Sequence, residues 1–189
     1  MEHLTRSRAG ACRPIRRALL AVLSSFVVLA PAMAASPHQH GAARLDVAVE
    51  GERITLSFES PLDNLVGFER AARTDAERQR AEAAVAQLKA ADAMFTIDGA
   101  AQCTPVKAEL NSAALALGSG ADADHGDGHA EIEGLYEFDC KNASRAGFID
   151  VGLFEAFPRM RRIDVQVVAP KGQMKAVLKR PSRRISLVR

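Results

Sequence analysis

The sequence predicts a mainly β protein, an antiparallel β-sandwich or partial barrel with one α-helix packed on it. Short runs in which apolar and polar residues alternate recur through most of the chain, and this two-residue period is typical of strands with one buried face. A single segment has the features of a long helix, and it lies early in the chain. Many short strands with one early helix favour a sheet folded on itself.

The first two predicted strands form an antiparallel hairpin. Apolar residues recur at every second position from 43 to 50 and again from 53 to 60, and Gly51 lies in the turn between the two runs. Two such runs joined by a short turn are typical of a β-hairpin. Further strands are predicted at residues 94–98, 103–110, 132–140, 148–154, 163–169 and 174–179.

The predicted helix runs from about residue 74 to residue 91. It begins with Thr74-Asp-Ala-Glu77, a capping box in which each of the two outer side chains bonds the backbone of the other residue. A narrow stripe of mostly small apolar side chains follows, formed by Ala81, Ala84, Val85 and Leu88. Such a stripe favours a helix that lies on a sheet.

Between the second strand and the helix lies an unusual segment, residues 59–69. Pro61 ends the strand and Gly67 permits a tight turn, yet the segment still holds four large apolar residues, Leu62, Leu65, Val66 and Phe68. A turn-forming stretch with this composition is expected to be a loop whose apolar side chains plug one end of the sheet.

The first 34 residues have the pattern of a cleavable export signal. Five arginines precede an uncharged apolar run from 18 to 30, which Pro31 and a small-residue site end, so we expect cleavage after Ala34. The run is too short to span a bilayer, which needs about 20 residues. Residues 35–189 would then form a single β-rich domain in the periplasm, without stable membrane insertion.

The charge of residues 35–189 argues against nucleic acid as a partner. These residues hold 20 Lys and Arg against 22 Asp and Glu, a net charge of about −2, whereas phosphate binding relies on a basic surface. They also hold two cysteines, Cys103 and Cys140. In an oxidising compartment we expect these two to form a structural disulfide.

A candidate metal site combines the histidines with nearby carboxylates. Residues 111–131 form a predicted mobile loop rich in Gly and Asp, which contains His125 and His129, and two further histidines, His38 and His40, follow the expected cleavage site. Imidazole with carboxylate is a ligand set that zinc prefers. The candidate ligands are His129, His125, His38, His40, Asp124, Asp127 and Glu131.

Composition alone leaves zinc binding and an incidental solvated loop about equally supported. Calcium ranks below zinc, because the loop lacks the ordered spacing of acidic residues that a calcium loop needs. The chain contains no G-x-S-x-G, H-E-x-x-H or glycine-rich phosphate motif. We therefore predict neither an enzyme nor an organic cofactor.

Four segments together resemble the ZrgA-like family of periplasmic proteins. They are HQHGAARLDV at 38–47, ESPLDNLVGFE at 59–69, HAEIEGLYEFDC at 129–140 and GLFEAFPRMRRIDVQVVAPKGQMKAVL at 152–178. ESPLDNLVGFE is the most specific of them, and the order is that of the family. The resemblance implies a mostly β, zinc-binding protein that assists zinc uptake and catalyses no reaction.

The resemblance also assigns residues. It places His38 and His40 at the family's N-terminal histidine motif, His129 at the histidine before the Tyr136 strand, and Cys103 with Cys140 at its paired cysteines. A candidate recipient of the zinc is the periplasmic binding component of a zinc-uptake transporter.

This chain departs from the family pattern in two places. Arg70 stands where the family usually continues GFE with a histidine, and the loop holds fewer histidines than is usual. Arginine does not give up its proton and cannot bind zinc, so we expect a smaller metal capacity. The alternative function is a non-metal envelope adaptor that binds a protein partner through its sheet or through residues 59–69.

Overall fold

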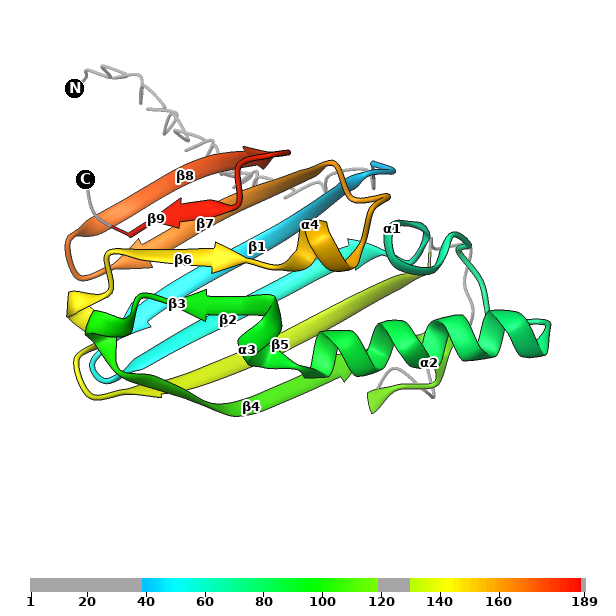
Figure 1. Ribbon diagram of the computed structural model, residues 1–189, viewed down its shortest axis with the longest axis horizontal. Helices are drawn as coiled ribbons and strands as arrows, with labels where there is room; N and C mark the ends of the chain where they lie inside the picture. Colours follow the sequence, from blue (N-terminus) through cyan, green and yellow to red (C-terminus); the bar gives the residue numbers. More distant parts are fainter. Residues whose placement is uncertain (1–38, 119–129, 188–189) are drawn as a thin grey trace, which may run out of the picture. The chain divides into compact units, whose positions relative to one another are not determined.

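The computed structural model describes residues 39–118 and 130–187 (Figure 1). Its strands are β1 (Ala42–Glu50), β2 (Arg53–Pro61), β3 (Phe95–Ile97), β4 (Cys103–Asn111), β5 (Glu131–Cys140), β6 (Phe148–Val151), β7 (Arg162–Ala169), β8 (Gly172–Lys179) and β9 (Arg184–Ser186). The helices are α1 (Asp63–Val66), α2 (Asp75–Lys89), α3 (Ala91–Met94) and α4 (Leu153–Ala156). Short 3₁₀ turns lie at Gly99–Ala101, Ala113–Leu115 and Ala143–Arg145.

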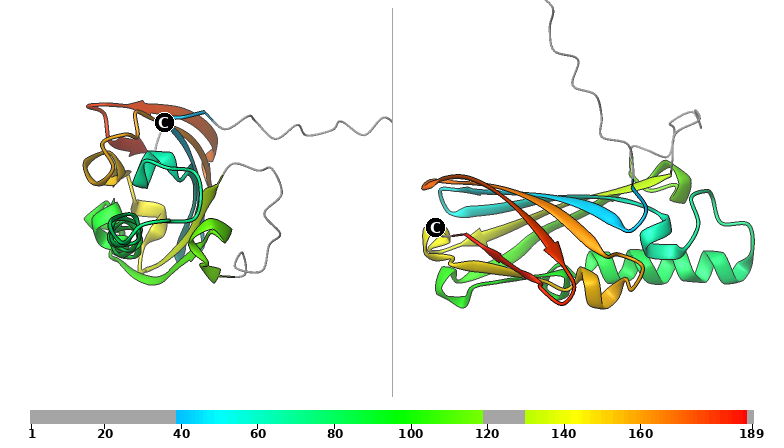
Figure 2. Two further views of the ribbon diagram at one scale, coloured as in Figure 1. Left: turned by 90° about the vertical axis from the view of Figure 1, so that its right-hand side faces the viewer. Right: turned by 90° about the horizontal axis from the view of Figure 1, so that it is seen from above.

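The described strands form two sheets that pack as layers. Six strands make the larger sheet in the order β4-β5-β2-β1-β7-β8, and the smaller sheet has the order β3-β6-β9. The smaller sheet and the helices cover one face of the larger one (Figures 1 and 2). Alternate residues of each central strand point into this interface, as the fully buried Leu45, Leu56 and Tyr136 show. The prediction of a mainly β, sandwich-like fold with a packed helix is confirmed.

One strand pair departs from the predicted antiparallel arrangement. β1 pairs with β7 in parallel, from Ala42 opposite Arg162 to Ala48 opposite Val168. The other pairs in the larger sheet are antiparallel. The direction of β7 depends on how the chain returns from the second layer, and the alternation within a strand carries no information about this path.

The helix prediction is confirmed at α2, and its capping box is present. The Thr74 side chain accepts a hydrogen bond from the backbone N–H of Glu77, and the Glu77 side chain accepts one from the backbone N–H of Thr74. Ala81, Ala84 and Leu88 are the buried residues of this helix. The predicted stripe therefore does face the core.

The strand predictions were incomplete near the C-terminal end. All eight predicted strands are present, but β9 was missed and the last residues of the predicted strand 148–154 belong to α4. β9 is only three residues long, and a period of two cannot be recognised over so few positions. Leu153 and Phe154 are buried in α4, so the apolar run that suggested a strand reflects burial of a helix.

Residues 59–69 do plug one end of the sheet. Leu62 and Val66 are 0% and 2% exposed, and Leu65 and Phe68 pack against the core at its margin. The segment is more ordered than the expected loop, because it forms α1 and ends at Gly67 with a φ of 86°. A positive φ of this size favours glycine.

The predicted disulfide is present between Cys103 and Cys140, which lie directly opposite each other on β4 and β5. The export signal lies outside the described residues, as does the loop between 119 and 129. The first and last residues of the predicted loop belong to the neighbouring strands, because β4 includes Asn111 and β5 begins at Glu131.

Candidate functional site

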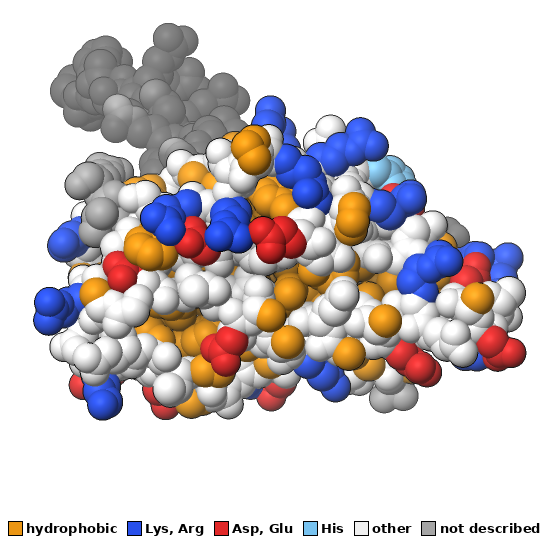
Figure 3. Space-filling view, viewed as in Figure 1, with side chains coloured by type: hydrophobic (Ala, Val, Ile, Leu, Met, Phe, Trp, Pro, Cys, Tyr) orange, Lys and Arg blue, Asp and Glu red, His pale blue; other side chains and the backbone are white. Residues whose placement is uncertain are grey.

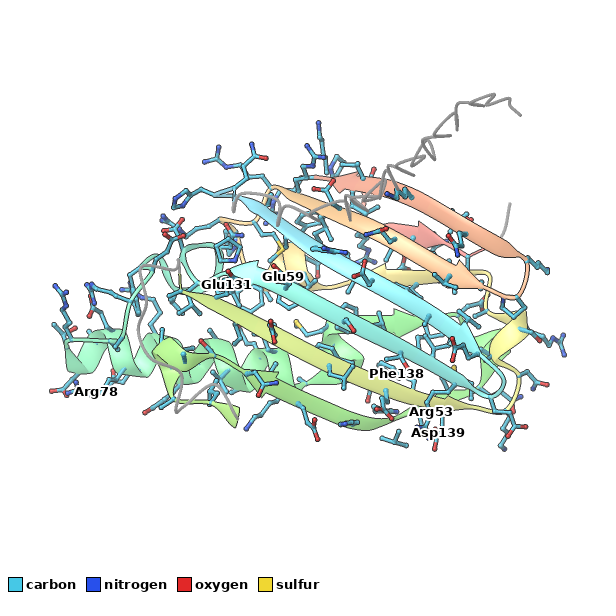
Figure 4. The ribbon with its side chains drawn as sticks, turned by 180° about the vertical axis from the view of Figure 1, so that it is seen from behind. Arg53, Glu59, Arg78, Glu131, Phe138 and Asp139 are labelled. Atoms are coloured by element: carbon cyan, nitrogen blue, oxygen red, sulfur yellow. A yellow bond between two sulfur atoms is a disulfide. The ribbon has the colours of Figure 1, made fainter. Side chains whose placement is uncertain are left out.

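Several strand ends and connections converge at one end of the larger sheet. β1 and β7 begin there, β2 ends there and β5 begins there, since Ala42 lies opposite Arg162 and Pro61 opposite Glu131. Figure 4 shows Glu59 and Glu131 at this end and Arg53 at the other. We call the polar side chains gathered beside α1 the His40 corner; they are His40, Asp63, Asn64, Glu69 and Arg159.

Asn64 builds the corner from within. Its side chain is fully buried and donates to the carbonyl of Ala42 at 2.7 Å and to Ser60 Oγ at 3.0 Å. The same amide accepts from the backbone N–H of Gly41 at 2.6 Å. Asn64 therefore joins the first residues of β1 to the last residues of β2, and it fixes the chain next to His40.

His40 lies between two carboxylates. Its Nδ1 is 3.4 Å from Asp63 Oδ2 and 3.6 Å from Glu69 Oε1. The side chains of Asp63 and Glu69 are 18% and 20% exposed, while that of His40 is 66% exposed. The corner thus presents one accessible imidazole beside two mostly covered carboxylates.

These separations suit neighbouring ligands of one small cation. Zinc with bonds of about 2.1 Å in a tetrahedron holds its ligand atoms about 3.4 Å apart. In residues 39–118 and 130–187, however, no group of three His, Cys, Asp or Glu side chains is arranged to hold a metal ion. The described corner therefore supplies part of a coordination shell.

Arg159 holds the carboxylate of Asp63 from the other side. Its NH2 group donates to Asp63 Oδ1 at 2.8 Å and its Nε donates to the backbone carbonyl of Asp63 at 2.9 Å. The chain just after Arg159 is itself fixed to the corner, because the backbone N–H groups of Arg161 and Arg162 donate to the carbonyl of Gly41. Asp63 therefore directs only its second oxygen toward His40.

The segment that carries Arg159 is held by Arg180. Its guanidinium donates to the backbone carbonyls of Met160 and Phe157, each at 3.3 Å, and also contacts the carbonyl of Phe154. Arg180 directly follows β8 (Gly172–Lys179) in the sequence, and basic side chains gather on the surface around this strand (Figure 3). A residue distant in sequence thus positions the loop that reaches Asp63.

Arg70 is engaged away from His40. Its guanidinium forms two hydrogen bonds with Glu77, at 2.9 and 2.7 Å, and lies 5.1 Å from the centre of the Phe68 ring. The hydrogen bond from Arg70, and then the one from the backbone of Arg73, lower the pKa of Glu77 from its ordinary 4.5 to about 2. Arg70 therefore braces the start of α2.

Two of the predicted metal ligands lie in the described residues. His40 is in the corner, and Glu131 begins β5. The others, His38, His125, His129, Asp124 and Asp127, lie outside the described residues. The N–H of Leu62 donates to the carbonyl of Ala130 at 2.9 Å, so the residue that follows His129 in the sequence is joined to the start of α1.

Sequence reasoning missed four members of the corner: Asp63, Asn64, Glu69 and Arg159. Three of them belong to the ESPLDNLVGFE segment, which was interpreted only by its apolar residues. Its acidic and amide side chains were the available signal. Arg159 lies 96 residues from Asp63, and no local pattern connects the two.

The fold and the corner define a class, a small two-sheet β protein with imidazole and carboxylate side chains at one end of its larger sheet. The chain belongs to the ZrgA family of zinc uptake proteins, because the model of that family matches residues 37–187. This family is not an enzyme family. A search of curated proteins gave no match. Within the described residues, no helix is both long and apolar enough to cross a membrane.

Proposed function

We propose that this protein is a periplasmic zinc-binding accessory protein that captures or buffers zinc and assists its uptake. Membership of a zinc uptake family supports the role in uptake. The Cys103–Cys140 disulfide supports an oxidising compartment, and the arginine-rich start of the chain supports export. A transporter's periplasmic binding component would be the recipient of the ion.

The observation that carries the proposal is the position of His40 between Asp63 and Glu69. Imidazole nitrogen and carboxylate oxygen are ligands that zinc accepts, and the distances from His40 Nδ1, 3.4 Å to Asp63 Oδ2 and 3.6 Å to Glu69 Oε1, are each close to the spacing of two neighbouring zinc ligands. The remaining ligands would come from the candidate histidines and acids that lie outside the described residues, His38, His125, His129, Asp124 and Asp127, with Glu131 at the start of β5.

Such a site suits capture followed by release. The corner alone offers fewer than four ligands, and the loop predicted from the sequence at residues 111–131 would supply others. A predicted mobile loop loses conformational entropy when it closes on an ion, and this loss weakens binding relative to a rigid four-ligand site. An imidazole binds zinc only when unprotonated, and ordinary imidazoles take up a proton near about pH 6.5. Zinc affinity should therefore fall as the pH drops from 7.5 toward about 5.5.

The first test is a calorimetric zinc titration of the EDTA-treated protein, purified after export, with nickel, copper and calcium as competitors. We expect saturable zinc binding that weakens at low pH. His40→Ala and Asp63→Asn should each weaken it on the order of tenfold or more. Asp164→Asn is the matched control, because Asp164 also pairs with an arginine, Arg162 at 2.6 Å, on the same sheet but outside the corner.

The loop histidines need a separate variant. His125→Ala combined with His129→Ala should reduce zinc affinity sharply and leave the melting temperature of the metal-free protein unchanged. An unchanged affinity would remove both residues from the proposed ligand set. Absence of saturable zinc binding by the unmodified protein would refute the proposed function and favour the envelope adaptor. In that case Leu62 and Val66 of the segment 59–69 would be poor contacts for a partner, since both are buried.

A further inference from the structure

Arg159 has a geometry that bears on which cation the corner accepts. Its guanidinium contacts Asp63 twice, at the carboxylate oxygen Oδ1 and at the backbone carbonyl. The two contacts together fix both the main chain and the side-chain rotation of one residue. Its own side chain is 57% exposed, so the ion pair adds little to stability, and its main consequence is the orientation of Asp63.

The consequence for Asp63 is that one oxygen is already used. Oδ1 accepts from Arg159 at 2.8 Å, and Oδ2 is the oxygen that lies 3.4 Å from His40 Nδ1. A cation beside His40 would therefore meet Oδ2 directly, and to bind Oδ1 as well it would have to compete with the guanidinium of Arg159. The backbone carbonyl of Asp63 is held by the same guanidinium, so it is also engaged.

Zinc and calcium respond differently to such a carboxylate. Zinc takes about four ligands, accepts imidazole nitrogen and is satisfied by one carboxylate oxygen. Calcium takes about six to eight oxygen ligands and often binds both oxygens of a carboxylate. A site with an imidazole and a one-oxygen aspartate is thus poor for calcium, although both ions are attracted by its negative charge.

We propose that Arg159 is a positioning residue that makes the His40 corner selective for zinc over calcium by holding Asp63 Oδ1. The inference rests on the proposed zinc binding at this corner. The positive charge of Arg159 repels both cations to a similar extent, so charge alone changes both affinities together. The ratio of zinc affinity to calcium affinity depends instead on the two hydrogen bonds from the Arg159 guanidinium to Asp63.

The test compares zinc titrations without calcium and with millimolar calcium, in the complete protein purified after export. In the unmodified protein calcium should leave the zinc affinity unchanged. In Arg159→Gln, which frees Asp63 Oδ1, calcium should lower the apparent zinc affinity on the order of tenfold. Arg159→Lys keeps the charge but loses the planar fork, and it should show the same sensitivity to calcium.

Arg161→Gln is the matched control, because Arg161 is an exposed arginine two residues away whose described bond to the corner is through its backbone. It should alter zinc and calcium affinities alike and leave their ratio unchanged. Circular dichroism of the metal-free variants checks that they fold. If Arg159→Gln does not fold, the result of the test is taken from Arg159→Lys.

Two results would overturn the selectivity role. If the unmodified protein binds zinc but calcium does not lower the zinc affinity of either Arg159 variant, the selectivity role of Arg159 is rejected and the proposed function is retained. If Arg161→Gln changed the ratio of zinc affinity to calcium affinity as much as Arg159→Gln does, loss of any nearby positive charge would explain the result, and Arg159 would have no specific role. No zinc binding by the unmodified protein would refute the proposed function and this inference together.

Discussion

The two ends of the six-stranded sheet are closed by different chemistry. At the end where β1 turns into β2, the Cys103–Cys140 disulfide joins β4 to β5, and Arg53 bonds Glu137 and Asp139 of β5 (Figure 4). At the other end, the buried amide of Asn64 joins β1 to β2, and Arg159 joins α1 to the segment before β7.

The two ends of the sheet differ in whether their groups serve mainly the stability of the fold or the binding of an ion. A disulfide stabilises the fold chiefly by restricting the unfolded chain, and it needs no accessible polar atoms. The other end carries His40, whose side chain is 66% exposed and whose Nδ1 lies 3.4 Å from Asp63 Oδ2, and an imidazole beside a carboxylate is a pair of ligands that a zinc ion accepts. We infer that the disulfide end secures the sheet while the His40 corner retains the chemistry of the site.

The largest expected effect comes from opening the disulfide end. Replacing both Cys103 and Cys140 by Ala removes a link between residues 37 apart, and the chain-entropy relation gives a loss of about 4 kcal/mol in the free energy of unfolding. Urea denaturation measures the loss. Zinc affinity of the folded variant should be unchanged, and a large fall in affinity would contradict the division between the two ends.

The next largest effect should come from Asn64→Ala at the other end. The substitution removes three hydrogen bonds and leaves the backbone groups of Gly41 and Ala42 without the amide, so we expect a loss of about 3 kcal/mol. Zinc affinity should fall as well, because the chain next to His40 is released. Asn142→Ala is the control, since Asn142 is half-buried and its cap position has no side-chain hydrogen bond.

A smaller effect that depends on pH is expected from Glu77→Gln, which removes the carboxylate bound by Arg70. The pKa of Glu77 is lowered to about 2 in the folded protein, so its contribution is fully present above 4.5, the ordinary value, and disappears as the pH falls toward 2. Urea denaturation should show a stability difference at pH 7 that narrows below 4.5. Glu82→Gln, at an exposed position on the same helix, should show a much smaller difference at every pH.

The smallest effect is expected in the middle of the sheet, from Tyr136→Phe. The hydroxyl of Tyr136 is buried and has no hydrogen-bond partner among the described residues, and burial raises the pKa of this side chain. Removing a buried hydroxyl that lacks a partner should change stability by less than about 1 kcal/mol. A larger loss of stability in urea denaturation would show that the hydroxyl does have a hydrogen-bond partner. The amide of Asn64 differs in that the structure shows its partners.

The elements with a strong local pattern were predicted correctly. The hairpin from Ala42 to Pro61 follows from its alternation, and α2 follows from the Thr74–Glu77 capping box. The parallel pairing of β1 with β7 was not predictable, because it joins residues about 120 positions apart, and the cost of bringing such segments together is recovered only through tertiary packing.

The candidate site was predicted only in part. His40 was identified from its residue type, but its carboxylate neighbours were not, since Asp63 and Glu69 lie 23 and 29 residues further along the chain. Arg70 was not proposed as a zinc ligand because of its chemistry, and its pairing with Glu77 became clear only from the geometry.

The sequence by itself determined eight of the described strands, the helix α2 and the kinds of ligand that the chain can offer, because side-chain period, capping and donor chemistry are local properties. Only the tertiary structure decided that the turn at His40, the start of α1 and the loop of Arg159 meet at one end of the sheet. Their meeting depends on strand order and on the buried bonds of Asn64, which join distant parts of the chain and leave no periodic signal in it.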